Sequence, residues 1–389
     1  MDTTLKNPVR WDALDVLRGL TIMLMLLNLA PGSWEFNYPF LVHAKWEGWT
    51  LIDMVAPAFL FCIGVAMPLS LERRSARGAT QGELLRHVLW RGLLLVGIGL
   101  FLNLYPRFEF ATFRIPGVLQ RIGLCYALSG VFMLLTAQRT EKGLVFRAPP
   151  ILWAAITIFV SYLLLLWLVP TPLCAAPCFD PAGSWPSVID RAVIGVDHFF
   201  PWWPVDGKVV FDPEGILSTW PACFNVLFGA LAGITWLRGG YQRPARTAIL
   251  VGIGMMTLAL MMHADHIPII KNIWTPPFAL FSSGFTLALL GVLIPVTQLP
   301  GVTRLFWPAR IFGENPLLAY ILVFLVAPLI DANWLGDAAA PTSLRNSGQA
   351  WFDQFTTPNA ASLLFALSGL LVLLAILVVC HRKRWILKL

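Results

Sequence analysis

Long apolar stretches separated by short polar segments make up most of this chain. Ten of them are close to the roughly 20 residues that a helix needs to cross the hydrocarbon core of a bilayer. They cover about 13–31, 50–71, 85–104, 116–137, 150–170, 216–237, 245–263, 273–297, 311–331 and 361–381. The pattern predicts an all-α polytopic membrane protein with about ten transmembrane helices, folded as a single domain over residues 1–389.

Composition agrees with this prediction. Hydrophobic residues form 57% of the chain and charged residues 13%, whereas a soluble domain carries about 25% charged residues. The first apolar stretch contains Asp15 and Arg18, and we interpret it as a span rather than a cleaved signal peptide. The sequence shows no Walker loop or dinucleotide fingerprint. We therefore expect a lipid bilayer around the protein and no nucleic-acid partner.

Charged residues are divided unequally between the two sets of connecting loops. With both termini cytoplasmic, 20 of the 28 basic residues lie on the inner side, as the positive-inside rule requires. Of the 21 acidic residues, 14 then lie outside. The alternation predicts cytoplasmic termini and two long outer loops, 171–215 and 332–360. An acidic outer face would attract a cationic substrate, and a basic inner face a phosphorylated one.

Two cysteines lie close together in the first long loop. Cys174 and Cys178 are separated by three residues, which does not match a CxxC zinc pattern, and no second pair supports a metal site. We expect no metal. A disulfide and two free thiols both stay open, and an oxidising periplasm would favour the disulfide.

The segment HAKWEGWTLID at 43–53 carries ionisable groups between two apolar stretches. His43 titrates near neutral pH, so it can act as a general base. Asp53 is placed to orient the imidazole, as the third member of a triad does. The T-x-x-D spacing from Thr50 also predicts that Asp53 caps a helix, and the two roles are compatible. Trp46 would form a wall of the site.

Polar groups near the ends of other spans complete the candidate set. Asn28 could donate a hydrogen bond to a developing oxyanion or bond a neighbouring helix. Arg121 lies about two turns into the fourth span and requires a partner there, either an acid or a ligand phosphate or carbonyl. The other candidates for binding substrate or cofactor are Arg18, Lys45, Arg114, Gln120, Asp212, Glu214, Lys271, Asn272, Trp274, Glu314 and Asn315. Helix capping or local ion pairing is the structural alternative for several of them.

Several strings occur in an order typical of one family. They are LDVLRGLTIMLMLLN at 14–28, HAKWEGWTLID at 43–53, PAFLFCIGVA at 57–66, RIPGVLQRIGLCY at 114–126, DHFFP at 197–201, FDPEGILST at 211–219, KNIWTPPFALFSSG at 271–284 and GENPLLAY at 313–320. From about residue 10 to 330 the chain resembles the heparan-α-glucosaminide N-acetyltransferase family, including its bacterial relatives. The resemblance implies that His43 is the active-site histidine, Asp53 its neighbouring carboxylate and Asn28 the family's asparagine of the first span.

The same resemblance implies an activity. Acetyl-CoA would donate an acetyl group to the amine of glucosamine or a terminal glucosaminide, with His43 as general base or as acyl carrier. The expected location is a bacterial inner membrane with periplasmic long loops, and a homodimer is a further expectation. Two other functions stay open: an amino-sugar transporter, and an O-acyltransferase that acts on a surface glycan. A transporter would place polar residues near the midplane between repeats, and no repeat is visible.

Overall fold

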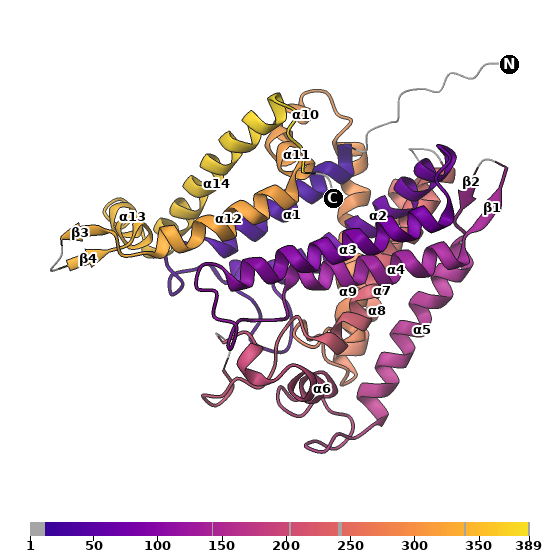
Figure 1. Ribbon diagram of the computed structural model, residues 1–389, viewed down its shortest axis with the longest axis horizontal. Helices are drawn as coiled ribbons and strands as arrows, with labels where there is room; N and C mark the ends of the chain where they lie inside the picture. Colours follow the sequence, from indigo (N-terminus) through magenta and orange to yellow (C-terminus); the bar gives the residue numbers. More distant parts are fainter. Residues whose placement is uncertain (1–11, 142, 202–203, 240–242, 338–339, 388–389) are drawn as a thin grey trace.

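The computed structural model describes residues 12–387 except 142, 202–203, 240–242 and 338–339. Helices dominate these residues, as the apolar pattern predicted (Figure 1). They are α1 (Asp12–Leu29), α2 (Val55–Ala76), α3 (Gln81–Leu104), α4 (Val118–Thr136), α5 (Ala148–Leu168), α6 (Trp185–Val193), α7 (Ile216–Gly239), α8 (Arg243–Ala264), α9 (Pro276–Val296), α10 (Val302–Leu305), α11 (Trp307–Glu314), α12 (Pro316–Asp331), α13 (Leu344–Asp353) and α14 (Pro358–Arg382).

Short elements join these helices. Three-residue strands form two antiparallel hairpins, in which β1 (Gln138–Thr140) pairs with β2 (Gly143–Val145) and β3 (Leu335–Asp337) pairs with β4 (Ala340–Thr342). The short 3-10 helices are η1 (Pro39–Leu41), η2 (Leu51–Met54) and η3 (Val196–His198). The predicted inner positions of residues 1–11, Lys142 and 388–389 lie outside the described residues.

Each predicted span coincides with a helix, but not all ten qualify as simple spans. In the described part of the chain, eight helices are long and apolar enough to cross a membrane: α2, α3, α4, α5, α7, α8, α9 and α14. Helices α11 and α12 form a ninth candidate that bends by 83°. Helix α1 packs against α11, α2 and α9 but carries Asp12, Asp15 and Arg18 in its first two turns.

The predicted span over 311–331 is bent rather than continuous. Asn315 separates α11 from α12, with φ −137° and ψ 49°. Pro316 explains the break, because a proline disfavours the helical conformation of the residue before it and has no N–H to continue the hydrogen-bond ladder.

Small residues allow the central helices to approach one another. A Cβ built on Gly64 of α2 would lie 1.9 Å from the carbonyl oxygen of Val226 in α7, and one on Gly19 of α1 would lie 1.6 Å from that of Ala309 in α11. Where lipid surrounds a bundle, such backbone packing replaces much of the hydrophobic driving force. These close backbone approaches join α2 to α7 and α1 to α11.

The two long loops have structure of their own. Figure 1 shows α13 and the β3–β4 hairpin at one end of α12 and α14, with α10 and α11 at the other end. Helix α6 lies at the opposite end of α5 from the β1–β2 hairpin. Each loop thus covers an end of the helices that it connects.

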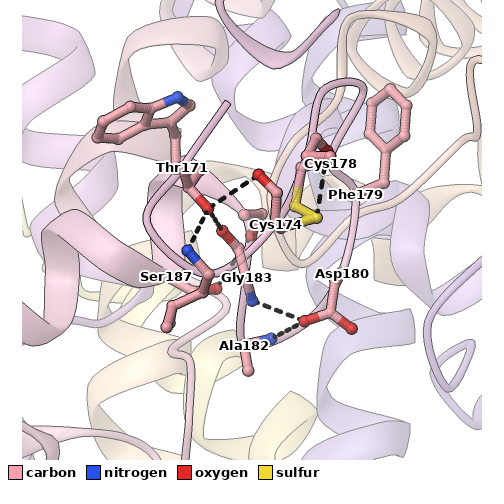
Figure 2. Close-up of a disulfide and its surroundings, with 12 residues drawn as sticks. Thr171, Cys174, Cys178, Phe179, Asp180, Ala182, Gly183 and Ser187 are labelled. Carbon is pink, nitrogen blue, oxygen red and sulfur yellow. Dashed lines mark hydrogen bonds between the residues drawn. A yellow bond between two sulfur atoms is a disulfide. The ribbon is translucent and has the colours of Figure 1, made fainter. Parts of the chain in front are cut away.

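A disulfide between Cys174 and Cys178 closes a turn in the first long loop. Figure 2 shows it above a second turn, where the Asp180 carboxylate accepts a hydrogen bond of 2.6 Å from the amide of Gly183. The Cys178 amide donates to the carbonyl of Leu166, which attaches the loop to the end of α5. Of the two cysteine states left open by the sequence, the structure contains the disulfide.

Candidate active site

Three side chains from two separate loops meet beside the start of α2. His43 Nδ1 lies 2.6 Å from Asp53 Oδ1. Lys271 Nζ lies 2.9 Å from the same histidine nitrogen, 3.5 Å from His43 Nε2 and 3.4 Å from Asp53 Oδ1. Asp53 is fully buried, the Lys271 side chain is 9% exposed and that of His43 is 24% exposed. The histidine is therefore the member of the cluster most accessible to a substrate.

The two carboxylate oxygens of Asp53 have different partners. Its Oδ2 accepts hydrogen bonds from the backbone amides of Ala44 (3.1 Å) and Thr50 (2.9 Å) and from the Thr50 hydroxyl (3.1 Å). The predicted capping interaction is thus present, at the start of η2. The same carboxylate presents Oδ1 to His43 and Lys271. A buried carboxylate with this many partners is held in one orientation.

The contact with Asp53 favours one tautomer of His43. A neutral histidine carries one ring N–H. With that hydrogen on Nδ1, the ring donates to Asp53, and Nε2, which lies 3.5 Å from Lys271 Nζ, carries the lone pair. The other tautomer would set a lone pair against the carboxylate at 2.6 Å, although Nδ1 could then accept from Lys271 Nζ at 2.9 Å. Burial and then the Lys271 ammonium lower the pKa of His43 below its usual value, against the opposing effects of Asp53 and Glu214. The lowered pKa favours the neutral form of His43, which can accept a proton.

Lys271 projects from a tightly held turn before α9. Trp274 in this turn is fully buried and has φ +52°, which is rare for a bulky residue. Its indole Nε1 donates to Asn225 Oδ1 at 2.9 Å, and the Thr275 hydroxyl donates to the Pro268 carbonyl at 2.8 Å. We did not identify Asn225 from the sequence. Its signal was a lone amide within an otherwise apolar span.

The segment that carries His43 is attached to its surroundings on two sides. The indole Nε1 of Trp46 donates to the carbonyl of Phe179, next to the disulfide, at 2.9 Å. The Trp46 ring also meets the Phe211 ring edge-on, with centroids 5.0 Å apart. On the other side, Asn272 Nδ2 donates to the Lys45 carbonyl at 3.5 Å, while the Lys45 side chain is exposed. Trp46 therefore lies between the histidine segment and the outer loop.

Arg114 joins the two acids that precede α7. Its Nε and Nη2 donate to the two oxygens of Asp212 at 2.8 and 2.7 Å, and Nη2 also contacts Glu214. Burial alone would lower the pKa of Arg114, but the two acids raise it above its usual range. Burial likewise raises the pKa of Glu214, but Arg114, Arg121 and Lys271 lower it overall. Arg114 and Glu214 are therefore both ionised at neutral pH.

Arg121 is buried, and of the partners that the sequence left open, its direct contacts in the protein do not include an acid. Its Nη2 donates to the carbonyl of Gly215 and to the hydroxyl of Ser218, both at the start of α7. The guanidinium lies over the Trp274 ring, 4.7 Å from its centroid, an attractive cation–π geometry. Within the described residues its Nε and Nη1 have no hydrogen-bond partner.

Two further candidates make backbone contacts. Asn28 Nδ2 donates to the Leu41 carbonyl at 2.7 Å, so it connects the end of α1 to η1. Gln120 Nε2 donates to the Ile115 carbonyl at 3.1 Å. Each of these hydrogen bonds gives the side-chain amide a structural role. Among the described residues, no group of three His, Cys, Asp or Glu side chains could hold a metal ion.

Arg18, Glu314 and Asn315 belong to another part of the protein. Arg18 pairs with Asp15 in the first half of α1, whereas the chain leaves the far end of that helix toward His43. Glu314 binds His381 at 2.6 Å, and Asn315 Nδ2 donates to the Trp385 carbonyl at 2.9 Å. An 18-residue helix is about 27 Å long. The structure therefore does not bring these three residues to the His43 cluster.

The fold and this site define a polytopic helical membrane protein with a buried histidine–aspartate–lysine cluster at one end of its bundle. Residues 10–179 match the family described as "Heparan-alpha-glucosaminide N-acetyltransferase, catalytic". The human heparan-alpha-glucosaminide N-acetyltransferase is 29% identical over 362 residues, which cover 81% of this chain and 52% of that protein. The mouse protein is 27% identical over 367 residues, or 82% and 54%. The chain thus spans about half the length of these curated relatives, and the predicted family resemblance is confirmed.

Proposed function

We propose that this protein transfers the acetyl group of acetyl-CoA to the amine of glucosamine or of a terminal glucosaminide. The observation that carries the proposal is the buried His43–Asp53 pair with Lys271 beside it, because His43 and Asp53 lie in the region that matches the catalytic family. An amine must lose a proton to attack a thioester, and a neutral, oriented histidine can accept that proton.

Each residue of the cluster has a role in the proposed reaction. The amine nitrogen attacks the thioester carbonyl carbon while His43 Nε2 takes the proton from that nitrogen. Asp53 holds the ring and stabilises the imidazolium, as in other triads. Lys271 is the cation next to the ring and would stabilise the negative oxygen of the tetrahedral intermediate. The carbon–sulfur bond then breaks, and the imidazolium returns the proton to the CoA sulfur.

A second route uses the same neutral ring as a nucleophile. His43 Nε2 would attack the thioester itself, release CoA and carry the acetyl group until the amine removes it. Both routes depend on the lowered pKa of His43. The experiment below separates them.

We also propose that the disulfide loop faces an oxidising compartment, such as the periplasm of a bacterium with this protein in its inner membrane. The Cys174–Cys178 bond supports this orientation, because disulfides persist in the periplasm and are rare in the cytosol. The predicted excess of acids on the same side would attract an amino sugar.

The test is acetyl transfer by the purified full chain in lipid nanodiscs. Radiolabelled acetyl-CoA is supplied with glucosamine or with methyl glucoside, which offers hydroxyls only. We expect labelled N-acetylglucosamine from the wild type and a loss of about 10²–10⁴-fold in His43→Ala. Label bound to the protein without an acceptor would indicate the acyl-carrier route. Equal labelling of both sugars would favour an O-acyltransferase. Glucosamine uptake into vesicles without acetylation would favour a transporter.

A further inference from the structure

We propose that Glu214 forms a subsite for the protonated amine of the acceptor, beside His43. The inference rests on the proposed amine acetylation and identifies the group that would select an amine over a hydroxyl. The Glu214 side chain is 9% exposed, whereas those of Asp53 and Asp212 are completely enclosed. Of these three carboxylates, Glu214 is therefore the one that a ligand can reach.

Contacts on two sides bring the segment from Phe211 to Glu214 next to the histidine. The Phe211 ring meets the Trp46 ring, three residues from His43, with 5.0 Å between centroids. From the other loop, Lys271 contacts His43 at 2.9 Å and also acts electrostatically on Glu214. Glu214 in turn acts on His43. The ring contact therefore places the segment from Phe211 to Glu214 beside the histidine segment.

The three carboxylates differ in which of their oxygens accept hydrogen bonds. Each Asp212 oxygen accepts one bond from Arg114 and one from a backbone amide, that of Phe200 or Glu214, both at 2.8 Å. Both oxygens of Asp53 are also engaged, as described above. Glu214 contacts Arg114 through Oε2, and within the described chain its Oε1 makes no hydrogen bond. Oε1 is the oxygen that can accept a bond from a ligand.

The cations around Glu214 are directed mainly at other partners. Arg114 donates two hydrogen bonds to Asp212 and contacts only Oε2 of Glu214. Arg121 directs its donating nitrogen at Gly215 and Ser218, and Lys271 lies against His43. These cations keep Glu214 ionised, and its Oε1 can accept a hydrogen bond from a protonated amine.

The proposed subsite orders the events of the reaction. One N–H of the ammonium donates to Glu214 Oε1, and a second N–H points to His43 Nε2, which removes that proton. His43 passes this first proton to solvent, and the nitrogen lone pair so formed attacks the thioester. Nε2 then takes the second proton from the nitrogen and returns it to the CoA sulfur as the carbon–sulfur bond breaks. A sugar hydroxyl can also donate to Glu214, but it carries no positive charge and lacks the Coulombic attraction that an ammonium has for the carboxylate at a buried site.

The test compares Glu214→Gln and Glu214→Asp with Glu47→Gln. Glu47 is an exposed acid in the histidine segment, so its variant removes the same charge from the same region. Initial rates are measured in nanodiscs against glucosamine concentration at saturating acetyl-CoA. Glu214→Gln should raise KM for glucosamine about 10- to 100-fold, the value of one charge-assisted hydrogen bond, with a smaller change in kcat. Glu214→Asp should restore part of the loss, and Glu47→Gln should leave KM unchanged.

The pH profile separates this role from a loss of packing. The charged groups facing Glu214 are Arg114, Arg121, Lys271, Asp212 and His43. Because Glu214 raises the pKa of His43, Glu214→Gln should move the acid limb of kcat/KM to lower pH. A wild-type KM in an active Glu214→Gln variant would overturn the subsite and leave the transferase intact.

If the wild type acetylates no amine, a binding measurement tests the subsite. The proposed transferase would then fail, and equilibrium binding of radiolabelled glucosamine to the same nanodiscs would test the subsite alone. Binding at least tenfold weaker in Glu214→Gln, with Glu47→Gln unchanged, supports the subsite. Equal binding, or none to the wild type, overturns it. Size-exclusion profiles and melting curves check that each variant is folded.

Discussion

Two histidine–carboxylate hydrogen bonds in this protein have the same length but lie in different surroundings. His43–Asp53 and His381–Glu314 are each joined through Nδ1 at 2.6 Å. In the first pair the carboxylate is fully buried and Lys271 lies against the ring. In the second pair, His381 is 44% exposed at the end of α14.

The comparison shows that two hydrogen bonds of equal length can lie in very different electrostatic surroundings. In the second pair the Glu314 side chain is 7% exposed, but His381 is open to water, which screens the interaction. Burial strengthens every electrostatic interaction around the first pair, because the dielectric constant is lower there. Lys271 can therefore keep the ring neutral while Asp53 orients it.

The largest effect should come from removing the carboxylate of the first pair. Asp53→Asn keeps the shape of the side chain but loses the charge that orients and stabilises the imidazole. We expect acetyl transfer to fall by about 10²–10⁴-fold, whereas His381→Gln should retain more than half of wild-type activity. Rates with radiolabelled acetyl-CoA in nanodiscs measure both. Similar losses in the two variants would contradict the distinction between the pairs.

The charge of Lys271 provides the second test. Lys271 lowers the pKa of His43, so Lys271→Gln should raise that pKa. The ring is then protonated, and inactive, at higher pH. The acid limb of kcat/KM should move to higher pH in Lys271→Gln and stay near its wild-type position in Lys271→Arg, which keeps the charge. An unmoved limb in the glutamine variant would show that Lys271 does not control the protonation of His43.

The outer loop that meets Trp46 should have a smaller effect. Cys174→Ser with Cys178→Ser removes a bond between residues four apart in sequence, worth about 2 kcal/mol of unfolding free energy by loop-closure entropy. We expect a lower melting temperature, and a rise in KM through Trp46 that is smaller than the effect of Asp53→Asn. Melting curves with and without reductant measure the first effect. The double variant should not respond to reductant, and a wild type that also fails to respond would contradict the prediction.

The smallest effect concerns Asp190, a buried carboxylate without the charge balance of Asp53. Its Oδ1 accepts from the Ile216 amide at the start of α7 at 2.9 Å. Burial raises the pKa of Asp190 to about 6, against the opposing effect of the α7 amides. Because the folded-state pKa is above the unfolded one, its stabilising contribution is complete below about pH 4 and is lost as pH rises through 6.

Asp190→Asn keeps the hydrogen-bond acceptor and cannot ionise. Between pH 5 and pH 7 the wild type should therefore lose about 1 kcal/mol more stability than the variant. Melting curves at the two pH values measure the difference. Asp190→Ala, which removes the cap, should be less stable than both at either pH.

Local interactions account for what could be predicted from the sequence. The helices follow from apolar stretches of spanning length, since a backbone in lipid must satisfy its own hydrogen bonds. The bend at Asn315 could have been identified from Pro316, but the apolar pattern runs through it. The cap of Asp53 on Thr50 was predictable because both residues lie within one turn.

The sequence by itself determined a helical membrane protein and identified the segment His43–Asp53 as its candidate site. Only the tertiary structure decided that Lys271, 228 residues from His43, lies against the imidazole, and that Glu314 and Arg18 do not. The physical reason is that charge, burial and proton affinity depend on neighbours across the bundle. Spacing along the chain specifies helix faces and caps, whereas the packing of α2, α7 and α9 specifies which loops meet.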